Sequence, residues 1–321
     1  MNKIFRNWLV ATALLSVPLA ASISEYRTFF GKTTLADGGE VIVIRRFIQN
    51  HRGFFLIVRP QTLATGIVPL AGLEVEAASL PDLQVRFAQS AYSKALAEAA
   101  ANSQANQDAG ITHSLPAERG ISLTIDLCPS KKPLDRFLFM DIVDAFGRVE
   151  HPVPLAIAVS GLWMEKHPQD LRWLSGLARA NQIRVDWINH SYHHQFNPRL
   201  PLRKNFLLEK GVDLDKEILK TEQKMIACGL TPSVFFRFPG LVSANSEFMR
   251  VLAYGLIPVG SDAWLAKKQK PGPGSIVLIH ANGNEPLGIK EFLALVRLEQ
   301  TDIKKRDWLL FDLRDSMARS E

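Results

Sequence analysis

Cysteine is scarce in this chain, which has only two among its 321 residues, Cys128 and Cys228. A small scaffold held together by several disulfides is therefore excluded. Cys128 follows a predicted strand, whereas Cys228 lies at the end of a predicted helix, and in an α/β layer these positions fall at opposite ends. We therefore expect two unpaired thiols.

A strong excess of charge and long apolar runs are also missing. The formal net charge is only +6, and no basic run carries interleaved aromatic residues, so nucleic acid is not an expected partner. Beyond the N-terminus, no run is long and apolar enough to span a bilayer. With 47% hydrophobic residues, the chain can bury a sizeable core in one large domain or two smaller ones.

The N-terminus has the pattern of an export signal. Lys3 and Arg6 precede an apolar run over residues 9–19, and small residues follow at 20–22. That run is shorter than the ~20 residues of a spanning helix. We expect residues 1–21 to be a signal peptide and the mature chain to be exported to the periplasm or the extracellular space, without an integral membrane span. An uncleaved anchor is the alternative.

The first third of the chain differs from the rest. Turn residues and short apolar runs predict a β-hairpin, and an Ala-rich stretch predicts a helix. We expect a small β-rich accessory region that ends in this helix and a polar linker, followed by a second domain. The predicted segments are the strands 41–48 and 54–58, the helix 87–101, the linker 102–110, the accessory region 22–115 and the second domain 116–321.

From residue 120 onward, short apolar runs alternate with amphipathic helical patterns. This alternation predicts a parallel β/α architecture whose strands are buried on both faces. The predicted strands are 121–125, 154–159, 183–188, 234–238, 256–259 and 276–279. The predicted helices are 134–146, 168–180, 214–227, 246–254 and 289–298.

Polar side chains stand at the ends of these predicted strands, where a β/α barrel carries its reactive groups. Asp126 ends the first strand, His190 and His194 follow the third, Arg237 lies among Phe residues, and His280 ends the last strand. Two imidazoles four residues apart can bind one divalent cation. Each residue also has an ordinary structural reading: a helix cap for Asp126, a solvated loop for the histidine pair, a surface position for Arg237 and a core position for His280.

Taken together, these residues provide what metal-assisted hydrolysis requires. A metal polarises a carbonyl and lowers the pKa of its bound water, a carboxylate accepts the proton, and a second group protonates the leaving group. The two histidines provide ligands for the metal. Asp126 and His280 provide the acid–base pair, and Arg237 provides a partner for a carboxylate.

The region from about residue 120 to 295 resembles the polysaccharide deacetylase (NodB-homology) family. Four segments in the family's order carry the resemblance. They are Thr-Ile-Asp-Leu-Cys-Pro-Ser at 124–130 for the motif T-F-D-D-G, His-Ser-Tyr-His-His at 190–194 for H-[S/T]-x-x-H, Arg-Phe-Pro at 237–239 for R-x-P, and Leu-Ile-His at 278–280 for L-x-H.

The resemblance implies an α/β fold with a distorted (β/α) barrel and an activity that removes acetyl groups from N-acetylated sugars. It implies a divalent metal, with zinc favoured, bound by His190 and His194. Asp126 would be the general base, Arg237 would orient it, and His280 would be the general acid.

The resemblance also implies residues around the substrate. Leu278 would line the acetyl pocket, and Pro239 of the third motif and Trp264 would contact the substrate. The fourth motif matches poorly, and Asp262 and Trp264 are the best candidates for its Asp and Trp. Asp262 would then tune His280.

One departure from the family concerns the metal. The second Asp of T-F-D-D is a metal ligand in the family, and here that position is Leu127, which cannot bind a metal. Asp126 would then be the third ligand, or His193 or Cys128 would replace it, or the site would bind no metal. A thiolate is a good zinc ligand.

The sequence therefore predicts an exported, metal-dependent hydrolase that deacetylates N-acetylated amino sugars of a cell-wall glycan or exopolysaccharide. Two alternatives remain open. One is a degenerate member that binds glycan without turnover, and the other is an O-acetyl esterase or small-amide hydrolase on the same fold. The long segment 195–213 is predicted to be either a lid facing the substrate or a surface loop.

Overall fold

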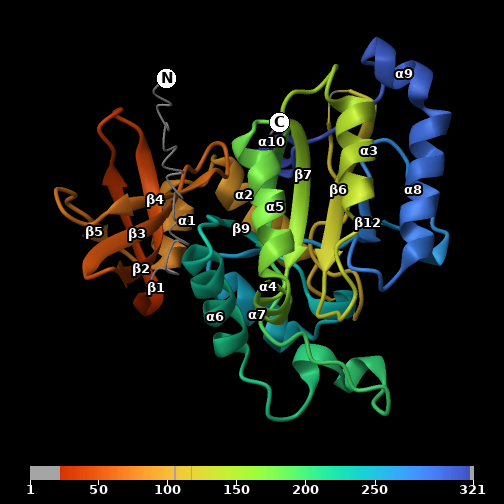
Figure 1. Cartoon of the computed structure of the whole chain (residues 1–321). Helices are drawn as coiled ribbons and strands as arrows, with labels where there is room; N and C mark the ends of the chain where they lie inside the picture. The colour runs from red at the N-terminus through yellow and green to blue at the C-terminus, as the bar shows by residue number, and fades with distance from the viewer. Residues whose placement is uncertain (1–21, 105, 117, 319–321) are drawn as a thin grey trace, which may run out of the picture.

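The computed structural model describes residues 22–318 except 105 and 117. The predicted signal peptide at 1–21 therefore lies outside the described residues. The chain forms two sheets, an antiparallel N-terminal one and a larger parallel one surrounded by helices (Figure 1). The predicted α/β class is confirmed.

The larger sheet is a distorted, incompletely closed β/α barrel. Its strand order is β10-β9-β8-β7-β6-β12-β11, every pair in it is parallel, and β13 pairs with β6. Short apolar strands of this kind are buried on both faces, as the sequence predicts. The strands are β6 (Gly120–Leu127), β7 (Val153–Val159), β8 (Ile183–Asn189), β9 (Pro232–Phe236), β10 (Ile257–Pro258), β11 (Ala263–Trp264), β12 (Ile276–His280) and β13 (Leu309–Leu310).

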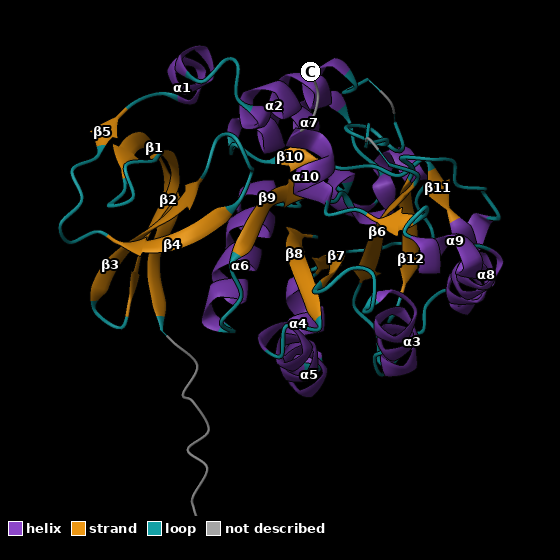
Figure 2. Cartoon of the chain, turned by 90° about the horizontal axis from the view of Figure 1, so that it is seen from above, coloured by secondary structure: helices purple, strands orange, loops and turns teal. Residues whose placement is uncertain are grey.

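Helices cover the outer face of this sheet (Figure 2). Their apolar sides pack on the strands, and in the described part of the chain no helix is long and apolar enough to cross a bilayer. The helices are α3 (Arg136–Phe146), α4 (Gly161–Lys166), α5 (Pro168–Arg179), α6 (Leu214–Ala227), α7 (Asn245–Ala253), α8 (Pro286–Leu298), α9 (Gln300–Lys305) and α10 (Leu313–Ala318).

The segment before β6 contributes to the barrel wall. Ile111 pairs with Val259 next to β10, and His113 pairs with Ser275 next to β12. These bridges lie between the strands at the open side of the sheet. The end of the predicted linker and the residues after it therefore have a structural role beyond connecting two parts of the chain.

The N-terminal sheet has the order β4-β3-β2-β1-β5, and all its pairs are antiparallel. The predicted hairpin is present, and the predicted Ala-rich helix corresponds to α2. The elements are β1 (Ile23–Thr34), β2 (Glu40–Gln49), β3 (Arg52–Val58), β4 (Thr65–Pro69), β5 (Glu76–Ala77), α1 (Leu80–Arg86) and α2 (Ala91–Ala101).

A buried ion pair joins this sheet to the barrel. Arg45 on β2 bonds to Glu222 on α6 through Nε at 2.7 Å and NH2 at 3.0 Å, and both side chains are fully buried. The Tyr26 hydroxyl also donates to Glu222, at 2.9 Å. Residues of β2 share one apolar core with β9 and α7. The accessory region is therefore packed firmly on α6, the helix that follows the predicted metal-binding segment.

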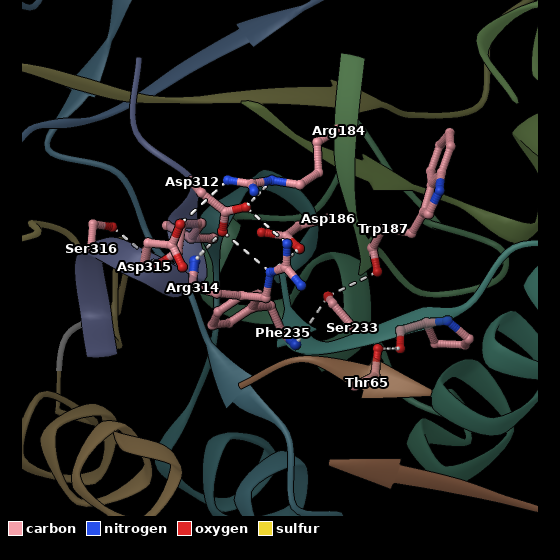
Figure 3. Close-up of polar contacts among 12 residues, drawn as sticks. Thr65, Arg184, Asp186, Trp187, Ser233, Phe235, Asp312, Arg314, Asp315 and Ser316 are labelled. Atoms are coloured by element: carbon pink, nitrogen blue, oxygen red, sulfur yellow. Dashed lines mark hydrogen bonds and ion pairs between the residues drawn. The ribbon is translucent and has the colours of Figure 1, made fainter. Parts of the chain in front are cut away.

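Charged residues also pair at the amino ends of the barrel strands (Figure 3). Asp312 accepts from Arg184 at 2.7 Å and from Arg314 at 2.8 Å, and Arg314 bonds to Asp186 at 2.7 Å. Both aspartates are buried. A buried charge is tolerated when it is paired, so this network joins the C-terminal segment to β8.

Candidate metal centre and active site

The side chains of β6 alternate between two environments. Leu123, Ile125 and Leu127 belong to the core beneath the helices. Asp126 lies on the other face, and Cys128 follows the strand in the same alternation. Leu127 is therefore a core residue, and the next polar position, Cys128, lies at the site. Cys128 and Cys228 are both free, which confirms the prediction of unpaired thiols.

His190 follows β8 and is fully buried. Its Nδ1 lies 2.8 Å from the Arg237 carbonyl oxygen, which can only accept, so Nδ1 carries the proton. Nε2 is left with its lone pair facing Cys128 Sγ at 3.4 Å. Burial lowers the pKa of His190, which keeps the ring neutral. A neutral imidazole oriented by a carbonyl is the form that binds a metal.

His194 completes a group of three potential ligands. One ligand atom from each of Cys128, His190 and His194 lies within 4.8 Å of the others. His194 Nε2 is buried and has no hydrogen-bond partner among the described residues. His194 has φ 47° and Ser191 has φ 62°, so two residues in the turn adopt the left-handed conformation that side chains disfavour. The turn is shaped to bring the two imidazoles together.

This donor set fits a divalent metal, zinc above all. Thiolate sulfur and imidazole nitrogen are both ligands of zinc, and catalytic zinc sites have three protein ligands and one open position. Burial alone would raise the pKa of Cys128, but His194 and His280 lower it to about 7, so the thiolate is well populated near neutral pH. Asp126, predicted as a ligand as well as a base, is not part of this group, although its Oδ2 lies 3.6 Å from His190 Nε2. His193 is half-exposed and pairs with Glu217 instead.

Asp126 lies beside these ligands with one oxygen free. Its Oδ1 has no hydrogen-bond partner in the described chain, and Arg237 NH1 is 3.8 Å away. Arg237 is fully buried and donates from NH2 to Thr124 Oγ1 at 3.0 Å. Burial lowers the pKa of Arg237, whereas Asp126 opposes that change. The predicted closeness of Asp126 and Arg237 is present, and Thr124 holds the guanidinium in place.

His280 lies next to Asp126, because the two residues are register partners on the adjacent strands β12 and β6. Its Nδ1 lies 2.9 Å from Glu285 Oε2, although the two atoms are not aligned as a hydrogen bond. Glu285 Oε2 also accepts from Trp264 Nε1 at 2.7 Å. Burial alone would lower the pKa of His280, but Cys128, Glu285 and Asp126 raise it well above its ordinary value. His280 therefore lies beside Asp126 with a raised pKa, which is what a general acid requires.

Asp262 does not take the place expected for it beside His280. Its carboxylate contacts His113 Nδ1 at 2.7 Å, Ser275 Oγ at 3.2 Å and the backbone N–H of Ile276 at 3.0 Å. Asp262 precedes β11, so it stands near the start of the strands, whereas Glu285 follows the end of β12. The carboxylate beside His280 is therefore Glu285, which the sequence reasoning missed.

Helix α6 fixes the turn that carries the two histidines. Glu217 accepts from the backbone N–H groups of Tyr192 and His193, both at 2.8 Å. Asn189 donates from Nδ2 to the Ile218 carbonyl at 3.0 Å. Sequence reasoning did not identify Glu217, because the residue lies 25 positions from Tyr192 along the chain.

The residues predicted to contact the substrate lie on β12, on β11 and directly after Arg237. Leu278 is buried on β12 and faces Thr124 in the register, and Trp264 pairs with Leu278 from β11. Pro239 starts the short helix η3 (Pro239–Leu241) directly after Arg237. That these three residues contact a substrate stays a prediction.

Comparison with solved structures finds partly similar chains at low identity. No protein-family model matches the chain. The family 4 carbohydrate esterase PdaA from Bacillus subtilis is 17% identical, with a TM-score of 0.47 over 77% of this chain and 92% of that one. The Bc1960 peptidoglycan N-acetylglucosamine deacetylase is 16% identical, with a TM-score of 0.47 over 65% and 93%. A family 4 pseudoenzyme from Bacillus anthracis is 17% identical, with a TM-score of 0.44 over 65% and 69%.

Proposed function

We propose that this chain is a metal-dependent hydrolase that removes acetyl groups from N-acetylated amino sugars of a polysaccharide. One observation carries the proposal: three metal-binding side chains lie within 4.8 Å of one another, beside a buried carboxylate oxygen that has no partner among the described residues. Buried polar groups are normally satisfied, so such a group indicates a missing ligand or reactant. The four family-like motifs in the sequence support the deacetylase reading.

Cys128, His190 and His194 would hold the metal. When bound there, a divalent metal supplies Lewis acidity and lowers the pKa of a water molecule. Asp126 accepts the proton of the attacking water at its free Oδ1, and Arg237 keeps this carboxylate in place. His280, protonated and supported by Glu285, then donates a proton to the amine that leaves as the amide bond breaks. Acetate and a free amino sugar are the products.

The test is acetate release from chitin oligomers by the zinc-loaded protein, compared with the Asp126→Asn and His280→Gln variants. We expect release by the wild type and a loss of about 10²–10⁴-fold in each variant, the usual contribution of a general acid or base. Oligomer binding without release would instead support a glycan-binding protein. Release from O-acetylated sugars alone would support an esterase.

Location and domain organisation are part of the same proposal. We infer that residues 1–21 direct export to the periplasm or the extracellular space, where cell-wall glycan or exopolysaccharide is the available substrate. Residues 22–115 then act as an accessory region attached to the catalytic domain at 116–321. Mass determination of the N-terminus of the exported protein tests this: a chain that starts near Ser22 supports export with cleavage, and an intact Met1 contradicts it.

A further inference from the structure

Exposed cations without ion-pair partners gather at the carboxyl ends of the barrel strands. All of them lie in segments that follow a strand end, on the side of the barrel that carries the candidate active site. None of them forms an ion pair with another described residue, although Arg136, which also follows β6, is paired with Asp170. The unpaired cations are Lys131, Lys132, Lys166, Arg199, Arg203, Lys204, Lys210, Lys267 and Lys268.

Two of these cations are tied to the site by direct contacts. Lys132 donates from Nζ to the Gly283 carbonyl at 2.9 Å, three residues beyond His280. Lys267 Nζ lies 3.6 Å from the ring centroid of Trp264, whose Nε1 binds Glu285. Glu285, the carboxylate that Trp264 contacts, lies 2.9 Å from His280 Nδ1. Both cations therefore lie beside residues of the candidate site.

Four more cations, Arg199, Arg203, Lys204 and Lys210, belong to the loop 195–213, which has a defined structure. Asn205 is fully buried and makes four hydrogen bonds within the loop, two through Nδ2 to the carbonyls of Asn197 and Leu200 and two through Oδ1 from the N–H groups of Asn197 and Phe206. A buried, fully bonded amide of this kind fixes the shape of a loop.

Phe206 holds this loop against the metal ligands. Its ring centroid lies 5.8 Å from that of His194 and 5.3 Å from that of Phe196. A Cβ atom at Gly240 would lie 2.4 Å from the Phe206 ring, so the glycine makes room for it. Phe196 is 58% exposed, and it stands at the rim of the site in the same loop as Arg203.

We propose that the substrate of this site is an anionic glycan, a chain of N-acetylated amino sugars that also carries carboxylate or phosphate groups. Phe196 offers a flat apolar surface to a sugar ring, and the cations of the loop and of Lys132 and Lys267 attract the acidic groups. Several like charges around one cleft add their fields and concentrate an oppositely charged substrate. This inference rests on the proposed deacetylase function and adds a substrate class to it.

The test compares chitin oligomers of one length in neutral, carboxymethylated and phosphorylated forms. For the zinc-loaded protein, kcat/KM for acetate release and Kd for each oligomer are measured at low and high salt. We expect about tenfold preference for the anionic forms at about 0.02 M salt, decreasing towards equality at about 0.5 M because salt screens exposed charges. The two anionic forms show whether carboxylate or phosphate is preferred.

Two double variants test whether the cations of the loop 195–213 cause the preference for anionic oligomers. Arg203→Gln/Lys204→Gln should reduce the preference about three- to tenfold, as expected for two exposed charges. Lys304→Gln/Lys305→Gln, a matched exposed pair on α9 at the opposite end of the barrel (Figure 1), should leave it unchanged.

Three outcomes overturn the inference: equal affinity for neutral and anionic oligomers, no salt dependence, or tighter binding of single-stranded DNA than of the anionic oligomers. A lack of acetate release from every oligomer would contradict the proposed function alone. In that case the Kd values and the variants still decide whether the cations select an anionic glycan.

Discussion

The two ends of the barrel treat buried polar groups in opposite ways. At the amino ends of the strands, Arg184, Asp186, Asp312 and Arg314 are all paired (Figure 3). At the carboxyl ends, buried atoms of Asp126, His194, Arg237 and His280 have no hydrogen-bond partner in the described chain. The fold therefore satisfies its polar groups where they only support structure and leaves them open where a ligand is expected.

The comparison predicts that substitutions at the carboxyl end change activity and those at the amino end change stability. The largest effect is expected for His190→Ala, which removes one of the three proposed metal ligands. Acetate release should fall by about 10³-fold or more, because a group essential to the chemical step is lost. Metal content, measured with the kinetics, should fall in parallel. His193→Ala is the matched control, and a similar loss there would contradict the assignment of ligands.

Removal of a charge at the amino ends of the strands should lower the stability of the fold without changing activity. Arg314→Gln leaves Asp186 and Asp312 without their shared partner, and a broken buried pair costs about 3 kcal/mol in the free energy of unfolding. Urea unfolding measures this cost. Zinc affinity and kcat of the folded fraction should match the wild type, and a change in either would show that the two ends are coupled.

Glu217→Gln, near the carboxyl ends of the strands, should have an effect of intermediate size on zinc affinity. The variant weakens the acceptor that fixes the Tyr192 and His193 backbone, so the two metal-binding imidazoles are held less well. We expect zinc affinity to fall about 10–100-fold, as for other groups that orient metal ligands. Lys220→Gln, an exposed position on the same helix, is the control. Unchanged zinc affinity in Glu217→Gln would show that the turn keeps its shape without this carboxylate.

The smallest effect is expected in the pH dependence of stability, through Glu150 at the amino ends of the strands. Glu150 accepts from the Leu310 N–H at 2.8 Å, and burial raises the pKa of Glu150 to about 7. A raised pKa means that the folded state binds this proton more tightly than the unfolded state. The stabilisation is then complete below the unfolded pKa of about 4.3 and is lost as the pH rises through about 7.

Glu150→Gln should remove this contribution. Relative to the variant, the wild type should lose about 1 kcal/mol of unfolding free energy between about pH 5 and pH 8, after allowance for its partial exposure. Urea unfolding of both proteins across this range measures the difference, and parallel pH curves would contradict it.

Much of the site could be predicted from the sequence, because strand ends and polar residues are local signals. Six barrel strands are predicted to within a few residues, whereas the two-residue strands β11 and β13 are not predicted. Asp126, His190, His194, Arg237 and His280 do come together. In a parallel sheet, whatever follows each strand collects at one edge, so the order of motifs is enough to place these residues.

What could not be predicted depends on pairing in space. Glu285 precedes helix α8 and Glu217 lies in helix α6. Neither belongs to a recognisable sequence motif, so only the fold shows that they contact residues of the site. Asp262 was misplaced because β11 is only two residues long, so a residue before it lies at the wrong end of the strand. The sequence leaves Asp126, His193 and Cys128 open as the ligand that replaces Leu127, and only the alternation along β6, which points Leu127 into the core, favours Cys128.

Nothing in the sequence of the N-terminal region indicates that it packs against the barrel. Arg45 looks like a surface residue of a hairpin, and only the fold brings it to Glu222 at 2.7 Å.

The central claim is that Cys128 binds a metal together with His190 and His194, and cobalt binding tests it most directly. Co²⁺ is titrated into the metal-free protein while the near-ultraviolet thiolate-to-cobalt charge-transfer band is monitored. We expect one equivalent to produce the band in the wild type and in Cys228→Ser, whose cysteine is exposed and free, and no band in Cys128→Ser. A wild type without the band, or an unchanged band in Cys128→Ser, would contradict the claim.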